Sequence, residues 1–184
     1  KAISESNMEG VDKMVSALWM VMILTGLTGM FTAFSRSSSD RYYAFSIFAV
    51  IAVLYLFALA GKPTIGYRFM KCAGIMMFLF SIILSIVSPS FRRKLWTPGC
   101  LLICLWMIIA GWAHRGQVYI QQDEFTHWGR AVKQLRELEV LPSTVGKALD
   151  YPSYPPGSTL FYAFWTWLGG EFNEGGTIAA ANVF

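Results

Sequence analysis

Long stretches without charged side chains are the feature that most limits how this chain can fold. Residues 14–34, 42–60 and 95–112 contain no Asp, Glu, Lys or Arg, and residues 68–87 contain only Arg68 and Lys71, near their start. A hydrocarbon layer of about 30 Å is crossed by about 20 apolar residues in a helix. These four stretches are therefore predicted to be transmembrane helices.

The composition agrees with a membrane protein rather than a soluble domain. Hydrophobic residues make up 55% of the 184 residues and charged residues 14%, whereas a soluble domain has about 25% charged residues. Two further apolar runs, residues 154–169 and 177–184, predict a fifth helix and the start of a sixth. We expect an all-α polytopic membrane protein with about five transmembrane helices and the beginning of another. Because the chain begins at Lys1 and ends inside the last run, we also expect a fragment of a longer protein.

The predicted helices and loops divide the chain into three regions: transmembrane helices in 1–112, one large polar loop in 113–153, and further transmembrane helices in 154–184. Lys and Arg gather in short cytoplasmic loops. The densest cluster, Arg92-Arg93-Lys94, is therefore placed in the cytoplasm, which puts the 113–153 loop on the extracytoplasmic side of the cell membrane. Lys62 would then also lie outside, so the charge pattern is mixed.

The cysteines and the net positive charge do not call for a redox site, a zinc site or nucleic-acid binding. Cys72, Cys100 and Cys104 all lie inside apolar runs, where free thiols act as small apolar residues. The net charge of +4 comes from Lys and Arg, which at the ends of spans serve topology and lipid headgroups. No nucleic-acid partner is expected.

The polar loop contains one segment with helical spacing, residues 124–139. Apolar residues recur there at intervals of three and four, which predicts an amphipathic helix on the membrane surface. These residues are Trp128, Ala131, Val132, Leu135 and Leu138. Four polar residues fall within about 60° of one another along one edge of this helix. They are Asp123, His127, Arg130 and Gln134.

The adjacent carboxylates Asp123 and Glu124 are the strongest candidates for chemistry. Glu124 projects toward the side of Trp128 and Leu135, so burial would raise its pKa, whereas His127 or Arg130 would lower the pKa of Asp123. Two carboxylates in different surroundings suit acid–base catalysis or metal binding. The plainer alternative is that Asp123 caps the helix and Glu124 favours its dipole.

A second motif, Tyr154-Pro155-Pro156-Gly157, leads into the next apolar run. An apolar span, an acidic pair opening a surface helix and a paired-proline entry into an aromatic span resemble, in this order, the start of the GT-C membrane glycosyltransferases. The resemblance is to bacterial relatives of the protein O-mannosyltransferases and of lipid A aminoarabinose transferase. It covers about half of the chain and includes Glu174 before Ala179-Ala180-Ala181-Asn182. This chain differs from that family in having three earlier spans, and in carrying Tyr154 where a His is common.

The resemblance implies transfer of a sugar from a polyprenyl-phosphate donor to an extracytoplasmic acceptor, in the plasma membrane of a bacterium. Asp123 would act as the catalytic base or a metal ligand, with Glu124 as its partner. The cofactor is left open, and a divalent metal ion held by this pair is one candidate. His127 and Arg130 would contact the donor phosphate or orient Asp123. The second motif would add Tyr154, Pro155 and Pro156 to the substrate site.

Two other classes of function stay open. An O-antigen ligase or polymerase would also have many spans and one large outer loop, and would rely on Arg and His, for example Arg115 and Arg130. A transporter, sensor or structural membrane domain is the non-enzymatic alternative. Against transport, none of the four complete spans has an ionisable residue in its middle, where ion pathways usually carry one.

Overall fold

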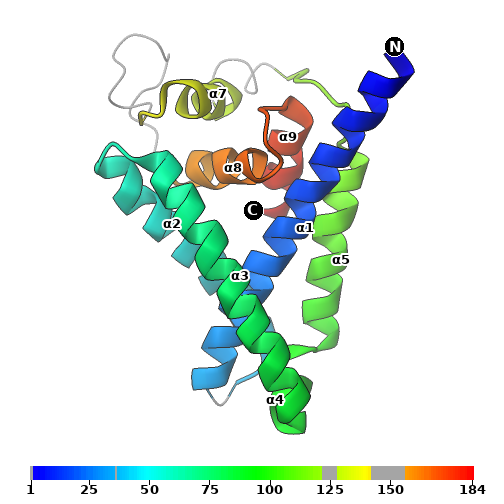
Figure 1. Ribbon diagram of the computed structural model, residues 1–184, viewed down its shortest axis with the longest axis vertical. Coiled ribbons are helices and arrows are strands. Elements are labelled where there is room, and N and C mark those ends of the chain that lie inside the picture. The colour runs from blue at the N-terminus through cyan, green and yellow to red at the C-terminus, as the bar shows by residue number, and fades with distance from the viewer. Residues whose placement is uncertain (1, 36, 122–127, 142–155) are drawn as a thin grey trace.

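The computed structural model describes residues 2–35, 37–121, 128–141 and 156–184, and the side chains from residue 14 onward. Within these ranges the chain is helical and contains no strand. Figure 1 shows the helices in the order α1 (Ala2–Phe34), η1 (Ser39–Arg41), α2 (Tyr43–Leu59), α3 (Pro63–Val87), α4 (Pro89–Leu95), α5 (Pro98–Ala113), α7 (Trp128–Leu138), α8 (Gly157–Leu168) and α9 (Glu174–Val183).

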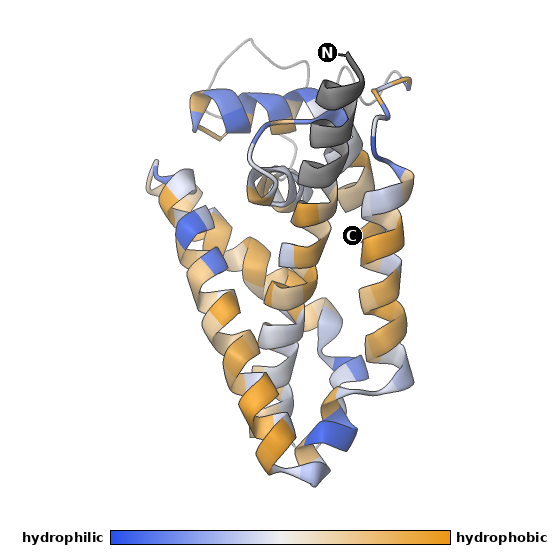
Figure 2. Cartoon of the chain, turned by 45° about the vertical axis from the view of Figure 1, so that its right-hand side comes forward, coloured by the Kyte–Doolittle hydropathy of each residue, from blue (hydrophilic) through white to orange (hydrophobic). Residues whose placement is uncertain are grey.

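Two helices are long and apolar enough to cross a membrane, namely Met14–Phe34 within α1 and all of α3. The pair α4 and α5 makes a third if its 52° bend lies within one span. Figure 2 shows apolar residues over the middle of these helices and polar residues at α4 and α7. The described residues thus form a helical protein with two or three candidate membrane spans, and the count of five stays a prediction.

The predicted fifth span, residues 154–169, contains a helix that does not cross a bilayer by itself. Helix α8 has 12 residues, which at 1.5 Å per residue gives about 18 Å against a hydrocarbon core of about 30 Å. Figure 1 shows α8 lying across the bundle, between α3 and α1 and beneath α7. Its apolar side chains are covered by protein, because nine of its residues are buried.

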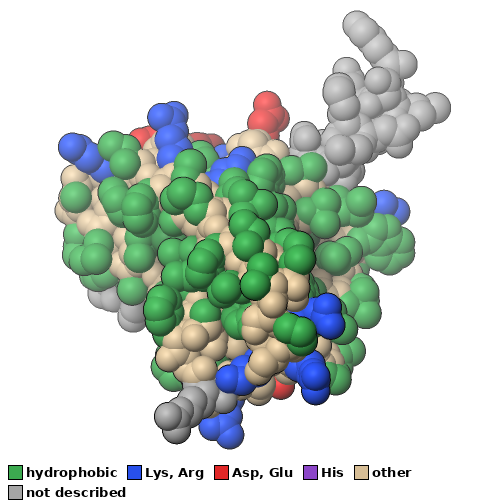
Figure 3. Space-filling view, turned by 60° about the horizontal axis from the view of Figure 1, so that its bottom comes forward, with side chains coloured by type: hydrophobic (Ala, Val, Ile, Leu, Met, Phe, Trp, Pro, Cys, Tyr) green, Lys and Arg blue, Asp and Glu red, His purple; other side chains and the backbone are tan. Residues whose placement is uncertain are grey.

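The loops separate into two opposite ends of the bundle (Figure 1). At one end, η1 is tied to the link between α4 and α5: the Ser39 hydroxyl donates to Leu95 O at 2.7 Å and lies 3.0 Å from Thr97 Oγ1. Asp40 also accepts a hydrogen bond from Thr97. Figure 3 turns this end toward the viewer and shows Lys and Arg around hydrophobic side chains. The turn at Gly61 and helix α7 lie at the other end.

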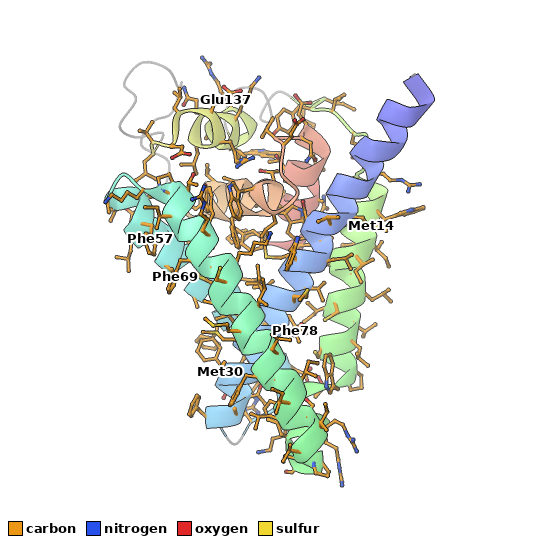
Figure 4. All side chains as sticks on the ribbon, in the orientation of Figure 1. Met14, Met30, Phe57, Phe69, Phe78 and Glu137 are labelled. Carbon is orange, nitrogen blue, oxygen red and sulfur yellow. The ribbon has the colours of Figure 1, made fainter. Side chains whose placement is uncertain are left out.

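Helices α1 and α3 cross at close range through glycines. A Cβ added to Gly26 would lie 2.6 Å from Phe78 N and 2.7 Å from Gly74 O, so the two backbones are in contact at this point. A Cβ on Gly74 would meet Ile23 Cγ1 at 2.6 Å. Small residues let membrane helices approach in this way and gain van der Waals contact. Figure 4 labels Phe78 on α3 at this crossing.

Hydroxyl groups add interhelical hydrogen bonds inside the apolar bundle. Thr25 Oγ1 lies 3.0 Å from Tyr43 OH, which in turn lies 3.2 Å from Cys104 Sγ, so α1, α2 and α5 meet at one polar cluster. Thr28 Oγ1 and Ser46 Oγ form a second α1–α2 bond at 2.8 Å. These buried polar atoms satisfy one another, as an apolar surrounding requires.

The close crossing predicts that Gly26→Ala destabilises the protein. The added methyl group would meet backbone atoms that cannot rotate away, and overpacking of this kind costs about 1–3 kcal/mol. Unfolding by SDS in mixed micelles measures the loss. Gly157→Ala is the matched control, because its Cβ would meet only Ile51 at 3.6 Å. Equal stabilities of the two variants would contradict the crossing.

The separation of the two ends predicts opposite labelling of two engineered cysteines. Ser90 on α4 and Lys133 on α7 are both exposed, at opposite ends. In intact cells, a charged maleimide should label Lys133→Cys and spare Ser90→Cys until the membrane is broken, if the Arg92-Arg93-Lys94 end is cytoplasmic. The unaltered chain controls for its native cysteines. The reverse pattern would invert the orientation, and equal labelling would disprove the separation.

Candidate functional site

The predicted site residues fall partly within the described structure. Asp123, Glu124 and His127, and Tyr154 and Pro155 of the second motif, lie outside the described residues. Their neighbours in sequence are described: α7 begins at Trp128, and α8 begins directly after Pro156. The candidate site is therefore defined here by the helices that follow the two motifs.

Helix α7 is amphipathic, and its apolar face packs on α8. Ala131, Val132 and Leu135 are buried, while Arg130 and Lys133 are exposed. The sequence pattern also assigned Leu138 to the apolar face, but its side chain is 53% exposed. The buried face ends before Leu138, because the helix stops there and the chain turns.

An aromatic cluster holds the first turn of α7. The Trp128 ring lies 5.6 Å from the Tyr119 ring and 5.8 Å from the Tyr162 ring, both edge to face. Such pairs contribute about 0.5–1.5 kcal/mol each beyond their buried area. Trp128 thus connects the stretch after α5, through Tyr119, to α8, through Tyr162. Trp128, which directly follows His127 in the sequence, is therefore held in a defined position.

The last turn of α7 is held by polar contacts. Arg136 Nη2 donates to Gly170 O at 2.7 Å, and Glu139 Oε1 accepts from Thr64 Oγ1 at 2.6 Å. Glu139 has a left-handed φ of 55°, which turns the chain away from the helix axis. Burial lowers the pKa of Arg136, and the negative charge of Glu139 nearby opposes this shift. Helix α7 is therefore fixed to α3 and to the α8–α9 turn.

Helix α8 forms the floor under α7. Phe161, Phe164 and Trp165 are fully buried, and the Tyr67 ring of α3 stacks on Phe164 at 5.7 Å. Gly157, the first residue of α8, lies against Ile51 of α2, where an added Cβ would meet Cγ2 at 3.6 Å. Pro156, predicted as a substrate-site residue, is half-buried at the entrance to this helix.

A polar network at the start of α9 was not predicted from the sequence. Glu174 Oε2 accepts from the backbone N–H of Tyr119 at 2.7 Å, and Asn173 Oδ1 caps α9 by accepting from Gly176 N at 2.6 Å. At the other end of α9, the Asn182 side-chain amide lies 3.1 Å from His114 Nε2. An Asn followed by Glu before an apolar run is a helix-start signal. No pattern of this kind in the sequence predicts the contact between Glu174 and Tyr119.

Metal ligands do not come together in the described part of the chain. Among those residues, no group of three or more His, Cys, Asp or Glu side chains could hold a metal ion. A divalent ion held by Asp123 and Glu124 stays a prediction.

Comparison with known proteins gives no relative: no family model, no curated protein and no solved structure matches this chain. A function for the site has to be supported by its own residues and by the helices that position them.

The α9 network predicts that Glu174→Ala destabilises the end of the bundle that holds α7. The substitution leaves the Tyr119 N–H without its acceptor and removes a negative charge from the first turn of α9, which together should cost about 1–3 kcal/mol. Thermal unfolding in detergent measures the change. Glu171→Ala is the control, because that side chain is exposed and precedes the helix. No difference between the two variants would show that the Tyr119 contact contributes nothing.

Proposed function

We propose that this chain belongs to a membrane glycosyltransferase that moves a sugar from a polyprenyl-phosphate donor to an extracytoplasmic acceptor. Asp123 is the base that takes the proton of the acceptor hydroxyl, or a metal ligand, and Glu124 assists it. The protein works as a multi-pass protein of a bacterial plasma membrane. The described fold, a helical bundle with apolar helices able to span a membrane, is compatible with this role.

The contact between α7 and α8 is the observation that supports this function most directly. Each helix directly follows one of the two motifs, and they are in contact through Trp128 and Tyr162, whose ring centroids are 5.8 Å apart. A site built from both motifs requires the segments that follow them to meet. The fixed ends of α7 also meet the need of catalysis for groups held in a defined geometry.

The location of α7 fits a lipid-linked donor. Helix α7 lies at the end of the bundle opposite α4, beyond the start of α3, whose apolar residues can span a bilayer (Figure 1). The phosphate of a polyprenyl-phosphate sugar lies at the membrane surface, at the level expected for this helix. Arg130 is exposed on α7, and a guanidinium can form paired hydrogen bonds to phosphate oxygens.

The test is transfer of labelled sugar from polyprenyl-phosphate donors in membranes that contain the full-length protein. Asp123→Asn and Glu124→Gln, at matched protein levels, should each reduce transfer by about 10²–10⁴-fold, the usual contribution of an acid–base group. Glu137→Gln is the matched control, because it changes an exposed carboxylate of α7 whose salt bridge, at 3.9 Å, is with the exposed Lys133 of the same helix.

The result also separates the proposal from its rivals. Loss of activity with Arg115→Ala or Arg130→Ala, but not with Asp123→Asn, would favour the ligase or polymerase class. Transfer by the carboxylate variants at the rate of the unaltered protein would overturn the assignment of Asp123 and leave the acidic pair as a helix cap. Absence of transfer from every donor would favour the non-enzymatic class.

A further inference from the structure

Buried polar atoms without partners gather where α3, α7 and α8 meet. Tyr67 is 1% exposed, and its hydroxyl has no hydrogen-bond partner among the described residues. The same holds for Nε of Arg136, whose guanidinium lies within Coulombic range of that hydroxyl. Leaving buried polar groups unpaired costs free energy, so such groups usually have a partner. Two donors here face a place where an acceptor would be stabilised.

A second cation, Lys71, shares an aromatic neighbour with Tyr67. Lys71 is one helical turn after Tyr67 on the same face of α3. Its Nζ lies 4.1 Å from the centre of the Trp19 ring and 5.9 Å from the centre of the Trp167 ring. The Trp167 ring also lies 5.6 Å from the Tyr67 ring. The ammonium group is thus held beside the aromatic surface of α8 that Tyr67 covers.

The charges of this cluster are not balanced. Among the described residues, neither Lys71 nor Arg136 has a carboxylate within 4.0 Å, and the one described salt bridge is that of Lys133 with Glu137. Arg136 Nη2 is bonded to a neutral carbonyl, that of Gly170. Glu139 acts on both Arg136 and Tyr67 through its charge, and its Oε1 accepts from Thr64. The cluster therefore holds Arg136 close to the Tyr67 phenol, with Lys71 one helical turn further along α3, and Glu139 is the carboxylate within Coulombic range of Arg136 and Tyr67.

We propose that this cluster binds the phosphate group of a membrane lipid. Near neutral pH, a lipid phosphate offers acceptor oxygens and carries negative charge, which matches the unpaired donors and the two cations. Lys71 is half-buried, so the cluster is reachable from its side. It lies within about 12 Å of the first residue of α3, eight residues along the helix, and headgroups are expected at this depth because long side chains reach up to them. Phosphate binding at this cluster does not depend on sugar transfer.

The test measures lipid binding by the full-length protein in detergent, through native mass spectrometry and the shift in melting temperature. Phosphatidylglycerol, polyprenyl phosphate, phosphatidylcholine and inorganic phosphate are added separately. We expect an anionic lipid to bind and stabilise the protein more than phosphatidylcholine does. Arg136→Gln and Lys71→Gln should each weaken that binding by about tenfold, the effect of losing one charged hydrogen bond.

Two further variants keep the test decisive if a charge substitution disturbs folding. Tyr67→Phe retains the ring that stacks on Phe164 and removes only the hydroxyl, so reduced binding with an unchanged melting temperature in the absence of lipid supports the site. Arg68→Gln is the control, because it removes an exposed charge next to Tyr67 and should leave binding unchanged.

The outcomes separate the sources of phosphate. Preference for phosphatidylglycerol assigns an ordinary anionic lipid, and preference for polyprenyl phosphate assigns a donor-type lipid; both support the site. Equal binding of inorganic phosphate and of lipid would overturn the assignment to a lipid. Equal binding by the unaltered protein and by the Tyr67, Lys71 and Arg136 variants would overturn the site itself, whether or not the protein transfers sugar.

Discussion

Burial of α8 is the constraint on which the half of the bundle near α7 depends. This helix is rich in Phe, Tyr and Trp and is too short to cross a bilayer by itself, so its aromatic surface must be covered by other parts of the chain. Helices α1, α2, α3, α7 and α9 supply that cover. Each of the three fully buried aromatic residues, Phe161, Phe164 and Trp165, removes about 150–250 Å² from solvent or lipid. The positions of the surrounding helices follow from this requirement.

The half of the bundle near η1 and α4 is held by different forces. There α1 crosses α3 at glycine positions and shares hydroxyl hydrogen bonds with α2, so close backbone contact and paired polar atoms replace aromatic burial. Between helices that already lie in lipid, apolar side chains gain little from leaving lipid for protein, and van der Waals contact and hydrogen bonds are left to drive association. This explains why Gly26, Thr25 and Thr28 of α1 are buried, while large apolar residues such as Leu79 and Ile83 of α3 face outward.

Helix α7 links these structural facts to function. Its first turn is fixed by Trp128 between two tyrosines, and its last by Arg136 and Glu139, so both ends of an 11-residue helix are tied to other parts of the bundle. The acidic pair in the proposed active site precedes the first anchor, and the proposed lipid-phosphate cluster lies at the second. If both proposals hold, one surface helix would connect the reacting groups to the lipid environment.

The sequence by itself determined the class of the protein and the existence of its helices. Uncharged stretches long enough to cross a bilayer, such as residues 14–34, leave the backbone no partner but its own helix, and spacing by three and four residues was enough to predict α7. The catalytic roles of Asp123 and Glu124 could be suggested from residue types and their order, but these residues lie outside the described structure.

The tertiary structure alone decided what covers each apolar surface. Residues 154–169 are as apolar as a span, but hydropathy measures only the tendency of a side chain to leave water, and both lipid and protein satisfy that tendency. Helix α8 within this run is buried, with Phe161 and Trp165 fully covered by protein, and it is too short to cross a bilayer by itself. Contacts such as Tyr119 with Glu174 and Arg136 with Gly170 join residues 55 and 34 positions apart. Such pairs depend on the path of the whole chain, because neither partner carries a local pattern that identifies the other.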